Sequence, residues 1–219
     1  MKTPLTKERL QNHITYSSWK YILLAVVAIF GWNLVYSVTA YQPPEEKKII
    51  LGLYTYADET DLNLYMESIR QELLPDMEEM NAQVIMPDEA YGAMILSTRI
   101  AARECDIYLL PRDSFQVYAS QGAFMPLEEV LPGLIADLGA AGISLSRGNR
   151  SNDELGEKHQ YGIPCADLPG IMPLLLADTR DMYLSVFFDT ENNENVLTFF
   201  DRFVRDMMID PATVAAPAQ

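Results

Sequence analysis

Residues 49–56 are IILGLYTY, a nearly continuous apolar run with charged residues before it and acidic residues shortly after it. A strand buried on both faces has this composition, and such strands belong to parallel sheets that are covered by helices. The run therefore predicts the first central strand of an α/β domain.

A helix is predicted to follow this strand. Its apolar side chains recur at three- and four-residue spacing, as one face of an amphipathic helix requires: Leu62, Tyr65, Ile69, Leu73, Met77 and Met80. Asp58, Thr60 or Asp61 can cap the start of this helix. Pro75 is expected to kink the helix or to split it at Leu74, because proline disfavours the helical conformation of the residue before it.

Strand and helix patterns keep alternating along the next part of the chain. We expect strands at residues 83–86 and 106–110, and a helix at residues 114–121 that ends at Gly122. One further helical turn is expected at residues 127–131. The helix between the two strands is predicted to turn one set of side chains toward the core: Tyr91, Met94, Ile95, Thr98 and Ala102.

The pattern loosens toward the C-terminus. Residues 143–158 are rich in Gly, Ser, Asn and charge, which indicates a loop. Residues 161–164 (YGIP) predict a short strand and residues 182–189 (MYLSVFFD) a longer one. Asn192 or Asn193 can cap a final helix. Its predicted core face consists of Val196, Phe199, Phe200, Phe203 and Met207.

The alternation of these elements is typical of a doubly wound α/β domain, in which helices cover both faces of a mainly parallel sheet. A separate apolar segment precedes it. Residues 21–41 (YILLAVVAIFGWNLVYSVTAY) contain no charged side chain. As a helix they extend about 30 Å, which is the thickness of the hydrocarbon core of a bilayer.

This apolar segment predicts a single transmembrane helix. Basic residues dominate residues 1–20, so we expect this tail in the cytoplasm and the domain outside the cell. The alternative is a cleaved signal peptide, because residues 38–40 (VTA) resemble a small-residue cleavage site. We favour the uncleaved anchor, since the apolar run exceeds the length of a typical signal sequence.

The sequence thus predicts five segments. They are a basic cytoplasmic tail (residues 1–20), a transmembrane anchor (21–41), a stiff polar spacer (42–48), an extracytoplasmic α/β domain (49–209) and a disordered tail (210–219). The chain has 16 Lys and Arg against 31 Asp and Glu, a net charge of −15. This balance argues against nucleic-acid binding, because the protein would repel a phosphate backbone.

The sequence contains none of the common catalytic motifs that we sought. The GxSxG, Gly-rich phosphate-loop and HExxH patterns are missing. The two histidines, His13 and His159, and the two cysteines, Cys105 and Cys165, do not make a metal site. The cysteines form either a disulfide outside the membrane or two separately buried thiols. We therefore expect a protein that is no enzyme and holds no cofactor.

The order of these segments resembles the extracellular solute-binding proteins of bacterial ABC importers, the sugar-type family in particular. The phrases behind this resemblance are, in order, IILGLYTYADE, AQVIMPD, CDIYLLP, QGAFMPLEEV, YGIP and MYLSVFFDTENNENVLTFFDRFV. They cover roughly residues 49–206. The resemblance implies a periplasmic-binding-protein-like fold, a carbohydrate-like ligand, and a membrane transporter or sensor as partner.

One departure from that family is large. In the family, a second lobe follows the Tyr-Gly-Ile-Pro strand, whereas here only residues 165–180 separate this strand from the next one. The chain therefore resembles the first lobe alone. A single lobe offers one wall to a ligand, so it buries about half of a small molecule and lacks closure as a signal.

Candidate ligand-binding residues follow from a rule for open α/β sheets, which bind ligands beyond the carboxyl ends of their strands. The rule selects Tyr54, Tyr56, Asp58, Glu59, Arg112, Asp113 and Tyr161. Tyrosines, carboxylates and an arginine suit a polyol, through ring stacking and paired hydrogen bonds. The competing interpretation is that Asp58 and Asp113 cap helices and that the tyrosines complete the core.

Two functions remain open. The first is a membrane-anchored, non-catalytic binding domain that senses or presents a small carbohydrate-like solute outside the cell. The second is a degenerate lobe that acts as a protein-interaction or structural module without a small-molecule ligand. Its contact face would then be the surface that the missing second lobe leaves exposed.

Overall fold

The computed structural model describes residues 7–39, 41, 43–88, 91–152, 156–175, 178–190 and 192–209. The chain divides into two units, Met1–Gln42 and Pro43–Gln219, which we describe separately. The tail predicted at residues 210–219 lies outside the described residues.

The first unit contains one long helix, α1 (Lys7–Thr39). Its part from Ser18 to Thr39 has 22 residues and a mean hydropathy of 2.0, so this part is long and apolar enough to cross a membrane. The hydroxyls of Ser37 and Thr39 donate to the carbonyls of Leu34 and Val35 in the same helix, at 2.9 and 2.6 Å. These polar groups are thus satisfied without water, as hydrocarbon requires. A transmembrane anchor and a signal sequence both fit these properties.

The second unit is built on a five-stranded sheet in the order β2-β1-β3-β7-β6. Its strands are β1 (Lys48–Leu53), β2 (Glu79–Val84), β3 (Ile107–Pro111), β6 (Ile163–Pro164) and β7 (Met182–Val186). Strand β1 pairs in parallel with β2 and β3, whereas β7 runs antiparallel to both β3 and β6. Four strands therefore point the same way. This arrangement confirms the predicted α/β fold with a mainly parallel sheet.

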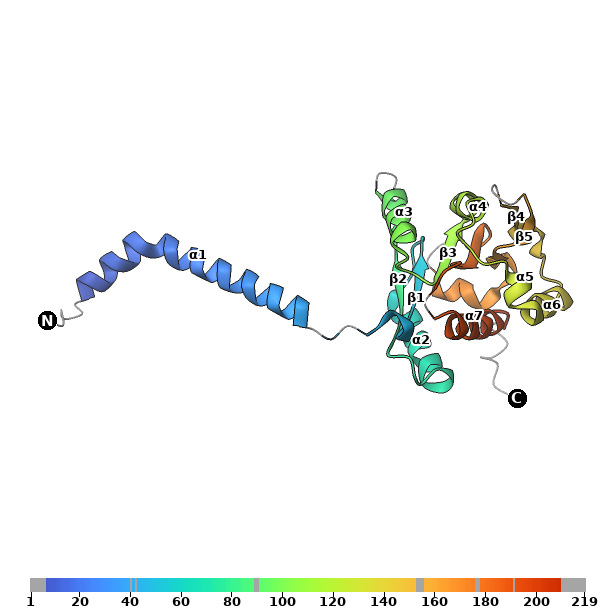
Figure 1. Ribbon diagram of the computed structural model, residues 1–219, viewed down its shortest axis with the longest axis horizontal. Helices are drawn as coiled ribbons and strands as arrows, with labels where there is room; N and C mark the ends of the chain where they lie inside the picture. The colour runs from blue at the N-terminus through green and yellow to red at the C-terminus, as the bar shows by residue number, and fades with distance from the viewer. Residues whose placement is uncertain are drawn as a thin grey trace. The chain divides into compact units, whose positions relative to one another are not determined.

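Helices cover both faces of this sheet (Figure 1). Helices α2 (Glu59–Leu73) and α7 (Asn193–Met207) lie on one face, and α3 (Gly92–Ala102) and α4 (Arg112–Ser120) on the other. Two further helices, α5 (Leu127–Val130) and α6 (Pro132–Ala140), follow α4. Short 3₁₀ turns connect the rest: η1 (Glu45–Lys47), η2 (Leu145–Gly148), η3 (Cys165–Asp167) and η4 (Pro169–Leu174).

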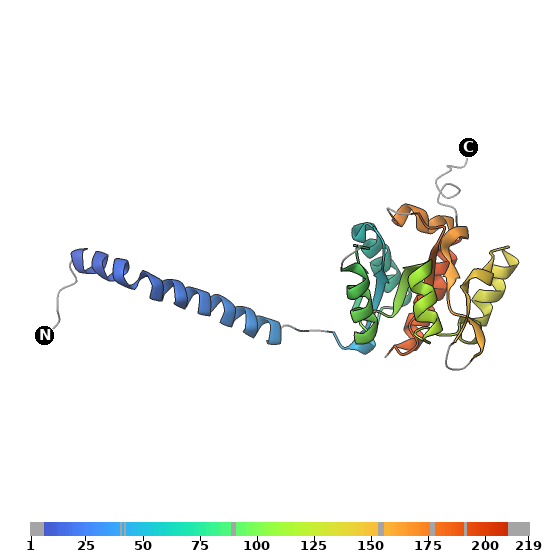
Figure 2. The ribbon, with the colours of Figure 1, turned by 90° about the horizontal axis from the view of Figure 1, so that it is seen from above.

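A small hairpin lies beyond the β6 side of the sheet. It consists of β4 (Asn149–Ser151) and β5 (Lys158–Gln160), which pair antiparallel. The two views place this hairpin with α6 at one end of the domain and α2 and α3 at the other (Figures 1 and 2). The sequence predicted a loop at residues 143–158, which was wrong at η2 and at β4. All six residues of the two strands are polar, so no apolar pattern indicates the hairpin, although only Ser151 and Lys158 are exposed.

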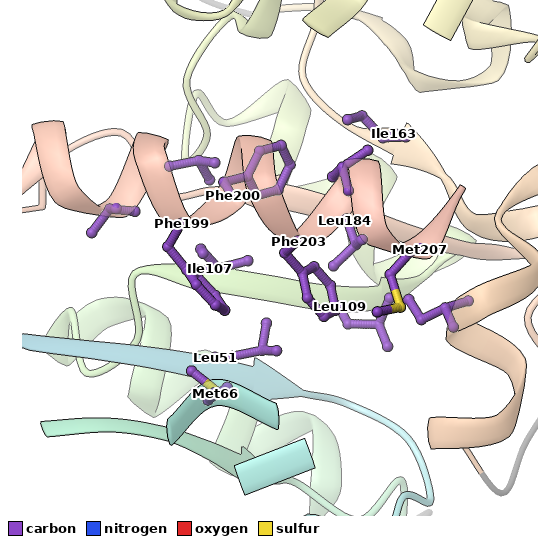
Figure 3. Packing of buried hydrophobic residues seen from close by; sticks show 14 of the residues in the cluster. Leu51, Met66, Ile107, Leu109, Ile163, Leu184, Phe199, Phe200, Phe203 and Met207 are labelled. Carbon is purple, nitrogen blue, oxygen red and sulfur yellow. The ribbon is translucent and has the colours of Figure 1, made fainter. Parts of the chain in front are cut away.

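The core consists of two layers that the central strands separate. Successive side chains of a strand point to opposite faces. Ile107 and Leu109 of β3 therefore pack toward α2 and α7, whereas Tyr108 and Leu110 pack toward α3 and α4. Figure 3 shows the first layer, with Phe199 and Phe203 of α7 directed at β3 and with Leu51 and Met66 beneath them.

Helix α7 has the predicted core face. Asn192 occupies its N-cap position. The five side chains that the spacing selected are all buried: Val196, Phe199, Phe200, Phe203 and Met207. The Tyr65 hydroxyl of α2 donates to the carboxylate of Asp206 at 2.8 Å, which ties the two helices together.

The predicted break at Leu74 is confirmed, but the chain after it does not return to a helix. Helix α2 ends at Leu73, with Leu74 as its C-cap, because Pro75 follows. Met77 and Met80 were assigned to this helix, but Met77 lies in the turn after it and Met80 lies in β2. Strand β2 accordingly begins at Glu79, earlier than the predicted start at residue 83.

The predicted core face of α3 was also wrong. Tyr91, Met94 and Ile95 are 61%, 59% and 40% exposed, whereas Gly92, Leu96 and Ile100 are buried. The reason lies at Gly92, where an added Cβ would be 2.6 Å from the Met86 carbonyl oxygen. This close approach of two backbones requires glycine and determines which side of the helix faces the sheet.

The segment between β6 and β7 returns directly to the sheet. Within it, Leu168, Ile171 and Leu175 are buried in the core, and Gly170 packs against the backbone of Met207. The described parts of this segment form the turns η3 and η4 rather than a second lobe. The single-lobe organisation that the sequence suggested is therefore present.

Two substitutions can test which side of α3 faces the core. Leu96→Ala should destabilise the domain by about 2–4 kcal/mol, because it leaves a cavity in the core. Met94→Ala should change stability by less than about 0.5 kcal/mol, since its side chain is exposed. Urea unfolding of the full chain in detergent measures both values. A larger loss for Met94→Ala than for Leu96→Ala would contradict the burial described above.

Candidate binding surface

Three parallel strands end at one edge of the sheet, which we call the carboxyl edge. Strands β1, β2 and β3 end there at Leu53, Val84 and Pro111. The chain continues from these ends into the start of α2, into the turn before α3 and into α4. Side chains from these three connections share the edge where open α/β sheets bind ligands.

The two tyrosines after β1 differ in exposure. Tyr54 is partly buried against the core layer beneath α3 and α4, and its backbone N–H donates to the Leu109 carbonyl at 2.9 Å. Tyr56 is 52% exposed. Tyr54 thus helps to complete the core, and Tyr56 offers an open ring face to a partner.

The two carboxylates that follow have structural contacts. Asp58 is the N-cap of α2 and accepts from the Thr60 N–H at 2.8 Å. Glu59 Oε1 accepts from the Val84 N–H of β2 at 2.8 Å, and Asn63 Oδ1 accepts from the Ala82 N–H at 2.7 Å. Strand β2 is an edge strand. Side chains of α2 therefore occupy two outward donors of that edge, where another strand would otherwise add.

Arg112 and Asp113 begin α4, and both are exposed. The backbone N–H of Arg112 donates to the Asp181 carbonyl at 2.8 Å. The N-cap residue of α4 is Pro111, which has no side chain that can accept from the first turn. Asp113 lies in that first turn, where the helix dipole favours a negative charge.

Tyr161 lies apart from the other six candidates. It precedes β6, so it lies toward the amino end of a strand that runs parallel to β3. Its side chain is 4% exposed, and its ring makes an edge contact with the His159 ring at a centroid distance of 5.8 Å. Burial raises the pKa of the Tyr161 hydroxyl. The structure thus brings six predicted residues to the carboxyl edge and leaves Tyr161 in the core.

Sequence reasoning missed one residue beside this edge. Arg150 of β4 lies close to Arg112, because both side chains donate to the amide oxygen of Gln116. This orientation of the Gln116 amide is assigned from its hydrogen bonds. The hairpin that contains Arg150 was read as a loop, so no pattern in the sequence linked it to α4.

A polar hollow lies at the opposite edge of the sheet. Its volume is about 560 Å³, and Lys48, Arg103, Asp106 and Asp189 are among the residues that line it. Asp106 Oδ2 accepts from the Ile50 N–H at 2.8 Å. Burial raises the pKa of the Asp106 carboxyl from its usual 3.8 to about 6. Its hydrogen bond joins the start of β3 to β1, although burial partly desolvates the carboxylate.

The two cysteines of the domain are buried, and its histidine pairs with a carboxylate. Cys105 and Cys165 are separate buried thiols. Burial raises the pKa of Cys105 to about 11 and also raises that of Cys165, so both stay protonated and are poor nucleophiles. His159 Nδ1 lies 2.8 Å from Glu128 Oε1, and this hydrogen bond raises the pKa of the imidazole. Among the described residues, no cluster of metal-binding side chains is found.

Comparison with known proteins gives structural similarity without sequence relatives. No family model and no curated protein matches this chain. An extracellular solute-binding protein of family 1 from Alicyclobacillus acidocaldarius is 20% identical, with a TM-score of 0.36, over 53% of this chain and 27% of that one. The N-glycan transport solute-binding protein from Streptococcus pneumoniae, solved with Man1GlcNAc, is 19% identical, with a TM-score of 0.33, over 53% and 24%.

This chain thus spans about a quarter of the length of these two solved chains. With TM-scores below 0.5, the similarities carry no argument about ligand or partner. The description of the fold rests instead on the sheet order and on the two core layers of this chain.

The buried carboxyl at the opposite edge predicts a pH dependence. Because the folded state raises the pKa of Asp106 from 3.8 to about 6, this group favours folding most below pH 4. Its contribution falls as the pH rises through 6. Asp106→Asn keeps an acceptor for the Ile50 N–H but cannot ionise. Relative to the wild type, the variant should gain about 1–3 kcal/mol of stability between pH 4 and pH 7.5.

Urea unfolding of the full chain at several pH values measures this gain. Asp113→Asn, at an exposed position, controls for the loss of one negative charge. If the difference in free energy of unfolding between Asp106→Asn and the wild type stayed constant over this pH range, it would contradict the desolvation of Asp106.

Proposed function

We propose that this chain is a membrane-anchored, non-catalytic binding domain with a solute-binding-protein-like fold, presented outside the cell. The proposal rests mainly on Tyr56 and Arg112 at the carboxyl edge. Both side chains are exposed there, whereas Asp58 and Glu59 beside them are engaged in structural hydrogen bonds. An aromatic face and a guanidinium, placed where open α/β sheets take ligands, suit recognition of a polar solute.

The lack of catalysis is supported by the state of the reactive groups. The two thiols are protonated, the His159 imidazole pairs with Glu128, and Asp106 holds the backbone of β1. None of these groups has the nucleophile–base geometry that covalent or acid–base catalysis needs.

The anchor is proposed from the apolar part of α1. Ser18–Thr39 extends about 33 Å at 1.5 Å per residue, enough to cross the hydrocarbon core. The basic residues that precede it favour a cytoplasmic N-terminus.

This topology is tested with tags at the two ends of the full chain. In intact cells, added protease should remove a C-terminal tag and leave an N-terminal tag intact. The N-terminal tag should also stay with the membrane fraction, since an uncleaved anchor keeps it attached. Recovery of a soluble domain that has lost the N-terminal tag would indicate a cleaved signal sequence instead.

Solute binding at an open wall is expected to be weak. A single lobe desolvates only one side of a small molecule, so dissociation constants in the millimolar range are expected. A carbohydrate-like solute could stack on Tyr56 and hydrogen-bond to Arg112, with Tyr54 behind it.

A thermal-shift assay tests this proposal on the full chain in detergent micelles. Neutral mono- and disaccharides at about ten times the dissociation constant should raise the Tm by about 3 °C, by mass action on the folded state. Arg112→Ala and Tyr56→Ala should remove the shift. Arg205→Ala is a matched control, because Arg205 pairs with Asp201 and Asp137 elsewhere on the domain. A shift that survives Arg112→Ala would place the solute elsewhere.

A second function is favoured by the exposed side of α3. Met94 and Ile95 of α3, its N-cap residue Tyr91, and Met86 in the turn before it are large apolar side chains that are 40% to 65% exposed. Exposed aromatic residues and methionines are enriched in protein interfaces. If no solute raises the Tm in the assay above, this surface supports the alternative of a protein-interaction module that binds no small molecule.

A further inference from the structure

The arginines of the α/β domain differ in their partners. Six of them form ion pairs with carboxylates: Arg70, Arg99, Arg103, Arg180, Arg202 and Arg205. Within the described ranges, Arg112, Arg147 and Arg150 form none, although acidic residues outnumber basic ones by 31 to 16 in this chain. Arg147 lines a separate hollow beside Arg180. Arg112 and Arg150 lie together.

These two arginines converge on one neutral group. The amide oxygen of Gln116 accepts from Arg112 Nε at 3.0 Å and from Arg150 Nη2 at 2.5 Å. Because both bonds end on the same atom, the two guanidinium groups are immediate neighbours. Two like charges held this close repel each other. Gln116 offers them an acceptor but no negative charge.

Arg150 is fixed in this position before any ligand arrives. Its Nη1 donates to the Asn149 carbonyl at 2.6 Å, and its guanidinium carbon lies 5.6 Å from the centre of the Phe115 ring. Phe115 is fully buried in α4. The guanidinium therefore lies against a rigid aromatic ring, so little side-chain entropy is lost when it binds a partner.

Arg112 still has donors to offer. Its Nε is engaged by Gln116, whereas its two terminal nitrogens make no hydrogen bond within the part of the chain that the structure describes. The neighbouring Asp113 forms no ion pair with either arginine within those ranges. Arg112 is the first residue of α4, and the N-cap residue of this helix, Pro111, provides no side-chain acceptor. Guanidinium and helix N–H groups both favour an oxyanion at this position.

We propose that Arg112 and Arg150, oriented by Gln116, bind a small solute that bears an oxyanion, either a carboxylate or a phosphate. The anion neutralises two adjacent positive charges that no carboxylate of the described chain compensates. This inference rests on the proposed binding function and specifies its ligand class, because it requires a charge on the solute. The inference also assigns a role to Arg150. Binding of a neutral solute by Tyr56 and Arg112 would not require this residue.

The test compares probes that differ in charge, on the full chain in detergent at constant ionic strength. Sodium glucuronate and potassium phosphate are titrated against glucose and sodium chloride, and binding is followed by the shift in Tm and by calorimetry. Glucuronate or phosphate should bind in the millimolar range, and glucose at least about tenfold more weakly. The probe that binds more tightly shows whether the site prefers carboxylate or phosphate.

Variants then assign the binding to the two arginines. Arg112→Ala and Arg150→Ala should each weaken anion binding about tenfold or more, and Arg205→Ala should leave it unchanged. Arg150→Lys keeps the charge but loses the planar fork, so it should bind with intermediate affinity. This variant also covers the case in which loss of the contact with Phe115 prevents Arg150→Ala from folding.

The outcomes separate this inference from the proposed function. If glucose and glucuronate bind equally, and Arg112→Ala but not Arg150→Ala or Arg150→Lys abolishes binding, the solute-binding function stands and the anion site is refuted. If all variants respond to phosphate as the wild type does, the effect is that of the salt alone and the anion site is refuted. Absence of any response to both anions refutes it as well.

Discussion

The architecture depends on one constraint, the burial of β1 and β3 between two layers of helices. Strands covered on both faces cannot bond their backbone groups to water, so they must pair with neighbouring strands. β1 satisfies this requirement between β2 and β3, and β3 between β1 and β7. The parallel pairs then direct the ends of β1, β2 and β3 to the same edge. The placement of Tyr56 and Arg112 at one edge therefore follows from the pairing of the buried strands. A change in the pairing of β1 would separate these two side chains.

The sequence predicted correctly those elements in which the pattern of apolar residues indicates which side chains are buried. Strand β3 is a short continuous apolar run that ends at Pro111, and helix α7 has an apolar face at three- and four-residue spacing. Both were located correctly. Helix α3 is different, because nearly all of its faces are apolar. Its orientation follows from Gly92, which contributes a close backbone contact rather than apolar surface. A method that counts apolar side chains cannot detect such a contact.

The side chains at the candidate binding surface were harder to predict than the fold. The strand-end rule placed Tyr54, Tyr56 and Arg112 at the carboxyl edge, where the structure also has them. It cannot distinguish a free carboxylate from one that accepts from a backbone donor, as Asp58 and Glu59 do. It also selected Tyr161, which lies before its strand rather than after it. Arg150 could not be found, because its proximity to Arg112 depends on how a polar hairpin folds back on α4.

The hydrogen bonds that β2 donates to Glu59 and Asn63 have a consequence for the membrane anchoring proposed above. Copies held by such an anchor would share one orientation and diffuse in two dimensions, so they would collide more often than free molecules at the same abundance. A bare strand at the flank of each copy would then promote sheet-to-sheet assembly. Two of those donors are already engaged by side chains of α2, so the edge of β2 would resist such assembly even if the proposed anchor crowded many copies together.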